Sequence, residues 1–208
     1  MLISRLLKLF FHWLYHPFAF AYDFVAAAVS FGHWNDWVQT VIPMIEGTRV
    51  LELGYGPGHL QRSLQRLNLL AVGLDESPQM SRLAARRLRN APAKVNLTRG
   101  LAQNLPFPAA TFDTIVSTFP SGYIVDVDTL SEVKRTLRNG GRLIVLMAAW
   151  PKNPFLGWLF RVTSQSPTET MELLESKIKE PFHETGFDVE IRAFDVQSSR
   201  LLTVIARN

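Results

Sequence analysis

The sequence predicts an α/β fold in which a mostly parallel sheet carries helices on both faces. Apolar runs suited to buried strands alternate with segments of helical periodicity from residue 49 to residue 147. A loop with glycine at every second position follows the first apolar run, and an acidic residue follows the second. Because open α/β sheets bind ligands at the carboxyl ends of their strands, these two features also predict where a ligand binds.

The first element is a strand over residues 49–53 that leads into the sequence GYGPGH. Glycine adopts positive φ readily and lets a ligand approach the backbone, so Gly54, Gly56 and Gly58 predict a binding turn. A dinucleotide-binding turn has the spacing G-x-G-x-x-G, whereas the position of its third glycine is His59 in this chain. The spacing is G-x-G-x-G instead.

The second strand is predicted over residues 70–74 and ends at Asp75. A carboxylate at this point can accept hydrogen bonds from both hydroxyls of a ribose, so Asp75 predicts a ribose-bearing cofactor. Asp75 also stands just before Ser77 and Pro78, which open the next helix, and a capping role is compatible with ribose binding.

The other elements follow from the same periodicities. Helices are expected over residues 58–67, 78–90, 126–138 and about 168–179, and strands over residues 94–98, 113–118, 141–147, 187–193 and 201–206. Asn139, Gly140 and Gly141 predict the end of the helix over residues 126–138. Apolar and polar residues alternate in the strand from residue 187, which indicates one exposed face.

Four segments in this order resemble motifs of the class I S-adenosylmethionine-dependent methyltransferases, in particular the ubiquinone/menaquinone methyltransferase-like group. They are ELGYGPGH at residues 52–59, Asp75 after the second strand, GLAQNLPFP with a following FD at residues 100–113, and SEVKRTLRNGGRLIVL at residues 131–146. Their conjunction is more specific than any one segment. The resemblance implies a Rossmann-like, mostly parallel seven-stranded sheet with an antiparallel C-terminal strand.

The resemblance also implies that the chain binds S-adenosylmethionine and releases S-adenosylhomocysteine. In the family, the acid of the first motif lies near the amino group of the cofactor, and the glycine backbone packs under its methionyl and ribose portion. The cofactor-binding residues implied here are Glu52, Gly54, Tyr55, Gly56, Gly58, Asp75, Glu76, Met80, Leu101, Ala102, Gln103, Thr118, Phe119 and Pro120. Leu101 replaces the usual acid that bonds the adenine, so this contact comes from backbone, from Gln103, or is missing.

The chain is expected to form a helical lid over residues 1–45 and one methyltransferase domain over residues 46–208, since 208 residues with 47% hydrophobic content can bury a single core. Residues 1–22 predict an amphipathic helix with Arg5 and Lys8 on its polar side. Charged residues interrupt this stretch too early for a membrane-spanning helix. The helix either lies on an anionic membrane surface or packs as a lid on the core.

Residues 21–37 resemble a segment of quinone-ring C-methyltransferases and phospholipid N-methyltransferases that closes over the cofactor and shapes the substrate pocket. On this resemblance Tyr22 and His33 are catalytic candidates, and Trp34 lies on the substrate side. The alternative is that the aromatic side chains serve packing. A carbon acceptor must also lose a proton to a base, for which His33, His59 and Tyr123 are candidates.

The activity implied is methyl transfer to a small hydrophobic or lipid-like acceptor of quinol or phospholipid type, in a cytoplasmic protein that can attach peripherally to a membrane. One alternative is an RNA methyltransferase that uses the basic helix over residues 78–90, with Arg82, Arg86, Arg87 and Arg89. Another is a noncatalytic cofactor-binding protein of the same fold, which Leu101 favours.

Several classes of site and partner are disfavoured by composition and motifs. The sequence STFP after the fourth strand lacks the Asp/Asn-Pro-Pro-aromatic motif of base N-methyltransferases, and no RNA-binding module is recognisable, so nucleic acid is the less favoured partner. The chain has no cysteine, which excludes disulfides and thiolate metal sites. Its 5 histidines show no ligand spacing, so no metal is predicted.

Overall fold

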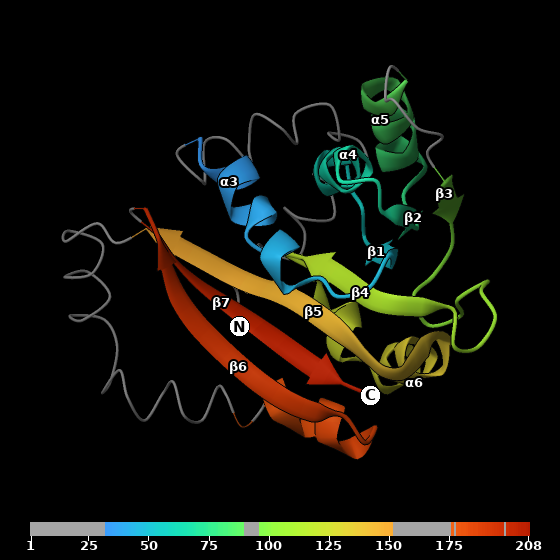
Figure 1. Cartoon of the computed structure of the whole chain (residues 1–208), viewed down its shortest axis with the longest axis vertical. Coiled ribbons are helices and arrows are strands. Elements are labelled where there is room, and N and C mark those ends of the chain that lie inside the picture. Colours follow the sequence, from blue (N-terminus) through green and yellow to red (C-terminus); the bar gives the residue numbers. More distant parts are fainter. Residues whose placement is uncertain (1–31, 90–95, 152–175, 177, 198) are drawn as a thin grey trace, which may run out of the picture.

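The computed structural model describes residues 32–89, 96–151, 176, 178–197 and 199–208. These residues build a seven-stranded sheet with the order β3-β2-β1-β4-β5-β7-β6 (Figure 1). Neighbouring strands are parallel from β3 to β5, while β7 is antiparallel to both β5 and β6. The predicted fold, including the antiparallel C-terminal strand, is confirmed.

The elements have the following bounds. The strands are β1 (Arg49–Leu53), β2 (Leu70–Asp75), β3 (Asn96–Arg99), β4 (Phe112–Thr118), β5 (Leu137–Pro151), β6 (Asp188–Val196) and β7 (Ser199–Arg207). The helices are α3 (Trp34–Gln39), α4 (His59–Arg66), α5 (Pro78–Leu88) and α6 (Val127–Thr136), with 3₁₀ turns η2 (Ile42–Met44) and η3 (Gly122–Val125). Residues 178–184 are also helical.

The helices cover both faces of the sheet, with α3, α4 and α5 on one face and α6 on the other (Figure 1). The chain moves from β1 to β2 to β3 in one direction along the sheet, and right-handed crossovers therefore place α4 and α5 on the same side. The step from β4 to β5 runs in the opposite direction and places α6 on the other side.

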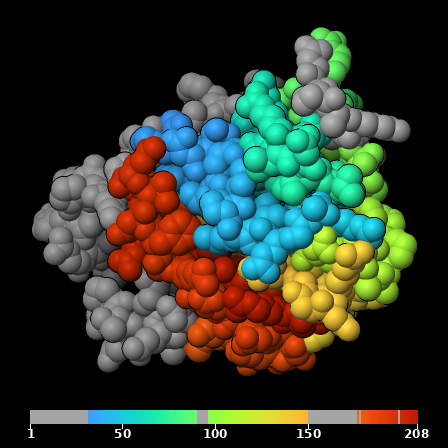
Figure 2. All heavy atoms as spheres, in the orientation of Figure 1, coloured from blue at the N-terminus to red at the C-terminus, as the bar shows by residue number. Residues whose placement is uncertain are grey.

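Each face has its own hydrophobic core. On the α6 side, Leu130 and Val133 pack with Phe182 and with strand residues such as Ile115. On the other side the core joins α3 and α4 to the central and C-terminal strands, through residues including Trp37, Leu60 and Leu201. Figure 2 shows the surface of this second contact, where α3 (blue) lies directly beside the C-terminal strands (red).

The start of α5 follows the pattern seen in the sequence. The Ser77 hydroxyl accepts a hydrogen bond from the backbone N–H of Met80 at 3.2 Å, and Pro78 occupies the first turn. In the same way the Asp126 carboxylate accepts from the N–H of Asp128 at 3.1 Å and begins α6. These caps fix where the two helices leave the carboxyl ends of β2 and β4.

The predicted boundary between the third helix and the fifth strand is wrong. Helix α6 ends at Thr136, and β5 begins at Leu137, not at residue 141. The Thr136 hydroxyl donates to the carbonyl of Glu132 at 2.8 Å, and the buried Leu137 pairs with Phe112. Gly140 does have a positive φ of 75°, but it lies within β5. Core packing of Leu137, which local sequence does not reveal, decides this boundary.

Other predicted bounds differ by a few residues at most, as for α5, which ends at Leu88, and for β6, which extends to Val196. The predicted helix over residues 1–22 and most of the helix over residues 168–179 lie outside the described residues. Within the parts of the chain that the structure describes, no helix is both long and apolar enough to cross a membrane.

Candidate functional site

A small, open cleft lies at the carboxyl ends of β1 and β4. Its walls come from α3, β1, the glycine loop, the start of α4 and the end of β4. The lining residues are Trp34, Val38, Glu52, Gly54, Tyr55, Gly56, Pro57, His59, Leu60 and Thr118. The cleft therefore brings together the first sequence motif, the end of the fourth strand, and a helix that precedes the sheet.

The glycine loop takes a conformation that side chains with a Cβ rarely adopt. Gly54, Gly56 and Gly58 have φ values of 70°, 51° and 83°. A Cβ added at Gly54 would lie 2.6 Å from the Tyr123 hydroxyl oxygen, while one added at Gly56 would meet no atom within 4 Å. The loop thus leaves open space above Gly56, where a ligand can approach the backbone.

A hydroxyl pair holds the end of β1 beneath this loop. The Ser117 hydroxyl donates to the carbonyl oxygen of Leu53 at 2.9 Å. The Tyr123 hydroxyl lies 2.9 Å from the Ser117 hydroxyl and 3.2 Å from the same carbonyl. Tyr123 does not line the cleft, and its observed contacts position the loop rather than reach into the site.

Asp75 joins the glycine loop to the end of β2. Its Oδ2 accepts from the backbone N–H of Gly56 at 2.8 Å, and its Oδ1 accepts from that of Ser77, also at 2.8 Å. Burial raises the pKa of Asp75, and the two backbone hydrogen bonds oppose this shift. The carboxylate was predicted from the sequence, but its bracing of the loop was not, because that contact joins residues 19 positions apart.

Glu52 is the most perturbed acid facing the cleft. Its side chain is only 2% exposed, and no described atom hydrogen-bonds to its Oε2. Burial raises the pKa of Glu52 to about 8, although a hydrogen bond with Gln61 opposes the shift and the charge of Asp75 adds to it. Glu52 is therefore mostly protonated at neutral pH, and a cationic group placed in the cleft would favour its carboxylate form.

An aromatic wall borders the cleft next to Thr118. The ring centroids of Trp34 and Phe119 are 4.4 Å apart at an interplanar angle of 35°. Phe119 has a φ of 50°, which is rare for a bulky residue and costs roughly 1–3 kcal/mol. Its N–H donates to the carbonyl of Leu146 at 2.8 Å, so strand pairing holds the strained backbone. The sequence carries no local signal for this conformation.

Other residues implied by the motifs lie outside the cleft lining. Met80 is buried in the core, Ala102 is buried, and Leu101 is 54% exposed. The Gln103 amide donates to Asp126 Oδ2 at 3.1 Å. Glu76 is exposed, Pro120 is half-buried, and Gly58 is the N-terminal cap of α4.

Of the two predicted catalytic residues, Tyr22 and His33, only His33 lies within the described residues. The ring of His33 is partly exposed, with its Nδ1 3.4 Å from Asp36 Oδ2. Tyr22 lies outside the described residues. His59 lines the cleft, as does Trp34, which follows His33 in sequence. Val38, Pro57 and Leu60 also line it and were not predicted. Val38 and Leu60 are apolar residues on helices, which indicate only a buried face, and Pro57 stands between two glycines of the loop.

The polar groups in and behind the cleft fit the cofactor that the motifs imply. A buried acid with an unpartnered oxygen lies beside a loop with accessible backbone, and Asp75 lies behind that loop.

Comparisons with known proteins agree with this cofactor. A family model described as a methyltransferase domain matches residues 50–141. A demethylmenaquinone methyltransferase of Thermotoga maritima is 30% identical over 203 residues, which cover 85% of this chain and 87% of that protein.

The chain belongs to the ubiquinone/menaquinone methyltransferase-like group of S-adenosylmethionine-dependent methyltransferases. A ubiquinone/menaquinone biosynthesis C-methyltransferase of Geobacter sulfurreducens is 31% identical over 64% of this chain, but the match spans only 55% of that protein. A solved structure from Pyrococcus horikoshii has a TM-score of 0.60 at 20% identity and covers 84% of this chain and 91% of its own. This last similarity shows the fold alone.

Proposed function

We propose that the chain transfers a methyl group from S-adenosylmethionine to a small hydrophobic acceptor, with a quinol-type ring as the preferred class. One observation carries this proposal: the buried acid Glu52, with its free Oε2, shares a cleft with the glycine loop and with the indole of Trp34. The names of the relatives support the quinol-type ring among small hydrophobic acceptors. Phospholipid-type acceptors are the second class within the same proposal.

Three groups of this chain hold the cofactor in the proposed function. Glu52 receives the cationic amino group of its methionyl part, because that charge stabilises the carboxylate in a buried position. Backbone of the loop around Gly56 supports the central part, and Asp75 accepts from the ribose. When bound, the cofactor supplies a methyl group already activated on a sulfonium. The protein then has chiefly to position the acceptor.

The acceptor lies against the aromatic wall formed by Trp34 and Phe119. Offset or tilted contact with these rings orients a flat acceptor and excludes water. Trp34 and Val38 of α3 line the cleft, which supports the proposal that residues 1–45 act as a lid over a domain formed by residues 46–208.

A ring-carbon acceptor also has to lose a proton to a base. We assign this step to His33, with Tyr22 as the second candidate. His59 is the competing base because it lines the cleft itself. Comparison of H33Q with H59Q separates the two histidines, since only loss of the base lowers the methylation rate while S-adenosylhomocysteine affinity is kept.

The test is a methyl-transfer assay with labelled S-adenosylmethionine and three acceptors offered in parallel: a short-chain naphthoquinol, phosphatidylethanolamine vesicles and total RNA. We expect label in the quinol extract. Label in RNA alone would support the alternative of an RNA methyltransferase. Cofactor binding without transfer to any acceptor would favour a noncatalytic cofactor-binding protein.

A further inference from the structure

The outer side of α4 and α5 forms a strongly basic surface. We define this basic surface by the exposed residues Arg62, Arg66, Arg82, Arg86 and Arg89. Neither helix contains an acidic residue. Between residues 59 and 89 the only acids are Asp75, which is buried, and Glu76. With Arg87 counted, this segment alone carries an excess of four positive charges, which equals the net charge of +4 of the whole chain.

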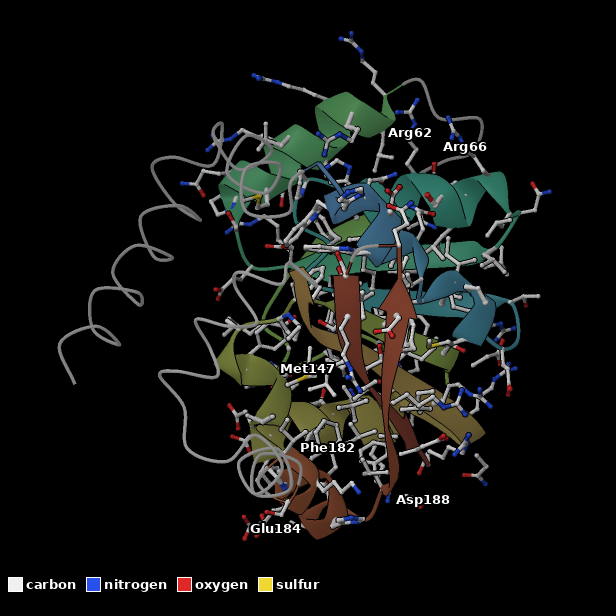
Figure 3. The ribbon with its side chains drawn as sticks, turned by 90° about the vertical axis from the view of Figure 1, so that its left-hand side faces the viewer. Arg62, Arg66, Met147, Phe182, Glu184 and Asp188 are labelled. Carbon is white, nitrogen blue, oxygen red and sulfur yellow. The ribbon has the colours of Figure 1, made fainter. Side chains whose placement is uncertain are left out.

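The arginines lie in rows on neighbouring helices. Arg62 and Arg66 are four residues apart on α4, and Arg82, Arg86 and Arg89 follow each other at spacings of four and three, so each set shares one helix face. In Figure 3, Arg62 and Arg66 lie at the end of the molecule that α5 occupies.

Direct contacts bring the two helices together. The guanidinium of Arg87, on α5, donates to the carbonyl of Pro57 at 2.7 Å, just before α4 begins. A Cβ at Gly58, the N-terminal cap of α4, would lie 3.1 Å from Leu88 of α5. Arg87 and Leu88 thus hold α5 against the loop that borders the cleft.

The charges of the basic surface are not neutralised within the described part of the chain, where none of its five guanidinium groups has a hydrogen-bond or ion-pair partner. Several arginines elsewhere do have partners: Arg135 lies 2.7 Å from Glu132 and Arg138 lies 2.9 Å from Asp113. Like charges at a spacing of four residues weaken a helix. The rows of arginines therefore do not stabilise the fold, whereas they would attract an anionic partner.

Two exposed apolar side chains between the end of α4 and the start of β2 distinguish between possible anionic partners. Leu67 and Leu70, which follow Arg66, are 51% and 64% exposed. Aliphatic side chains beside arginines suit the boundary between lipid head groups and acyl chains. Proteins that bind single-stranded nucleic acid stack bases on aromatic side chains, and α4 and α5 contain no Phe, Tyr or Trp.

We propose that the basic surface docks the protein onto an anionic membrane, with its arginines at the lipid phosphates and Leu67 and Leu70 at the acyl boundary. His59, three residues before Arg62 on α4, also lines the cleft. A lipid surface along this face of α4 therefore reaches the mouth of the cleft. The inference goes beyond the proposed methyl transfer and is independent of which acceptor is methylated.

The test is sedimentation of the full chain with phosphatidylcholine vesicles that contain phosphatidylglycerol, compared with vesicles of phosphatidylcholine alone. The test variant is R82Q/R86Q/R89Q. The matched control, R49Q/K179Q/R200Q, removes the same charge from positions outside α4 and α5. Both variants are first checked for wild-type thermal unfolding and S-adenosylhomocysteine binding. A second variant, L67S/L70S, tests the apolar contact.

We expect the test variant to lose roughly a hundredfold in affinity for the anionic vesicles, because each arginine near such a surface contributes a factor of about five. The control should stay within a factor of about five of wild type, and L67S/L70S should bind more weakly at low and high salt alike. Equal losses in both charge variants would overturn the proposal. So would unchanged binding of the test variant, or salt-sensitive RNA binding without vesicle binding.

Discussion

Replacement of Glu52 by glutamine tests whether burial keeps this acid protonated. In the folded chain the pKa of Glu52 is raised from 4.5 to about 8, whereas in the unfolded chain it returns to its ordinary value. The folded state therefore holds the proton more tightly. The contribution of Glu52 to stability is greatest below about pH 4.5, falls as the pH rises toward about 8, and is level above that.

The size of this effect follows from the shift. A shift from 4.5 to about 8, at about 1.4 kcal/mol for each pKa unit, lowers the free energy of unfolding by up to about 5 kcal/mol across that pH range. Glutamine has nearly the same shape and does not ionise. E52Q should therefore match wild type at about pH 5 and exceed it by several kcal/mol at about pH 8.5.

Urea unfolding of the cofactor-free protein, followed by tryptophan fluorescence, measures this difference at both pH values. The control is E184Q, which removes the exposed carboxylate of Glu184 (labelled in Figure 3) at the end of the helical residues 178–184. Its unfolding free energy should differ from wild type by the same small amount at both pH values. A constant difference between E52Q and wild type would refute the protonated state of Glu52.

Four further predictions concern binding, the loop, the acceptor and the core. S-adenosylmethionine affinity of wild type should rise with pH up to about 8, as Glu52 ionises, and E52Q should lose this dependence in calorimetric titrations. G54A should lower the melting temperature and weaken cofactor binding, because its Cβ would lie 2.6 Å from the Tyr123 hydroxyl oxygen at a φ of 70°. W34L should keep cofactor affinity but raise the KM for a quinol about tenfold, as measured in steady-state methyl transfer. F182A should lower the free energy of unfolding by about 3–5 kcal/mol in urea without changing cofactor affinity, since Phe182 is fully buried far from the cleft lining.

The sequence predicted those parts of the fold and site that depend on local pattern. Spacing alone identified Gly54, Gly56 and Gly58, and the structure gives all three the positive φ that glycine tolerates. The end of an apolar run located Asp75 at the edge of β2. Strand-to-helix alternation and family motifs together predicted the sheet, including the antiparallel β7.

Features that arise from distant parts of the chain were not predictable in this way. The raised pKa of Glu52 depends on burial and on Gln61 and Asp75, which come from two other elements. Phe119 takes a positive φ because Leu146 of β5 holds its backbone N–H. The start of β5 at Leu137 depends on its pairing with Phe112.

The most direct test of the central proposal, that this cleft holds S-adenosylmethionine, is calorimetric titration of wild type and D75A with S-adenosylmethionine and S-adenosylhomocysteine. Loss of Asp75 removes both the proposed ribose contact and the hydrogen bond that braces Gly56. We expect wild type to bind both compounds at one site and D75A to lose that binding. Absence of binding to wild type, or equal binding to D75A, would contradict the proposed site.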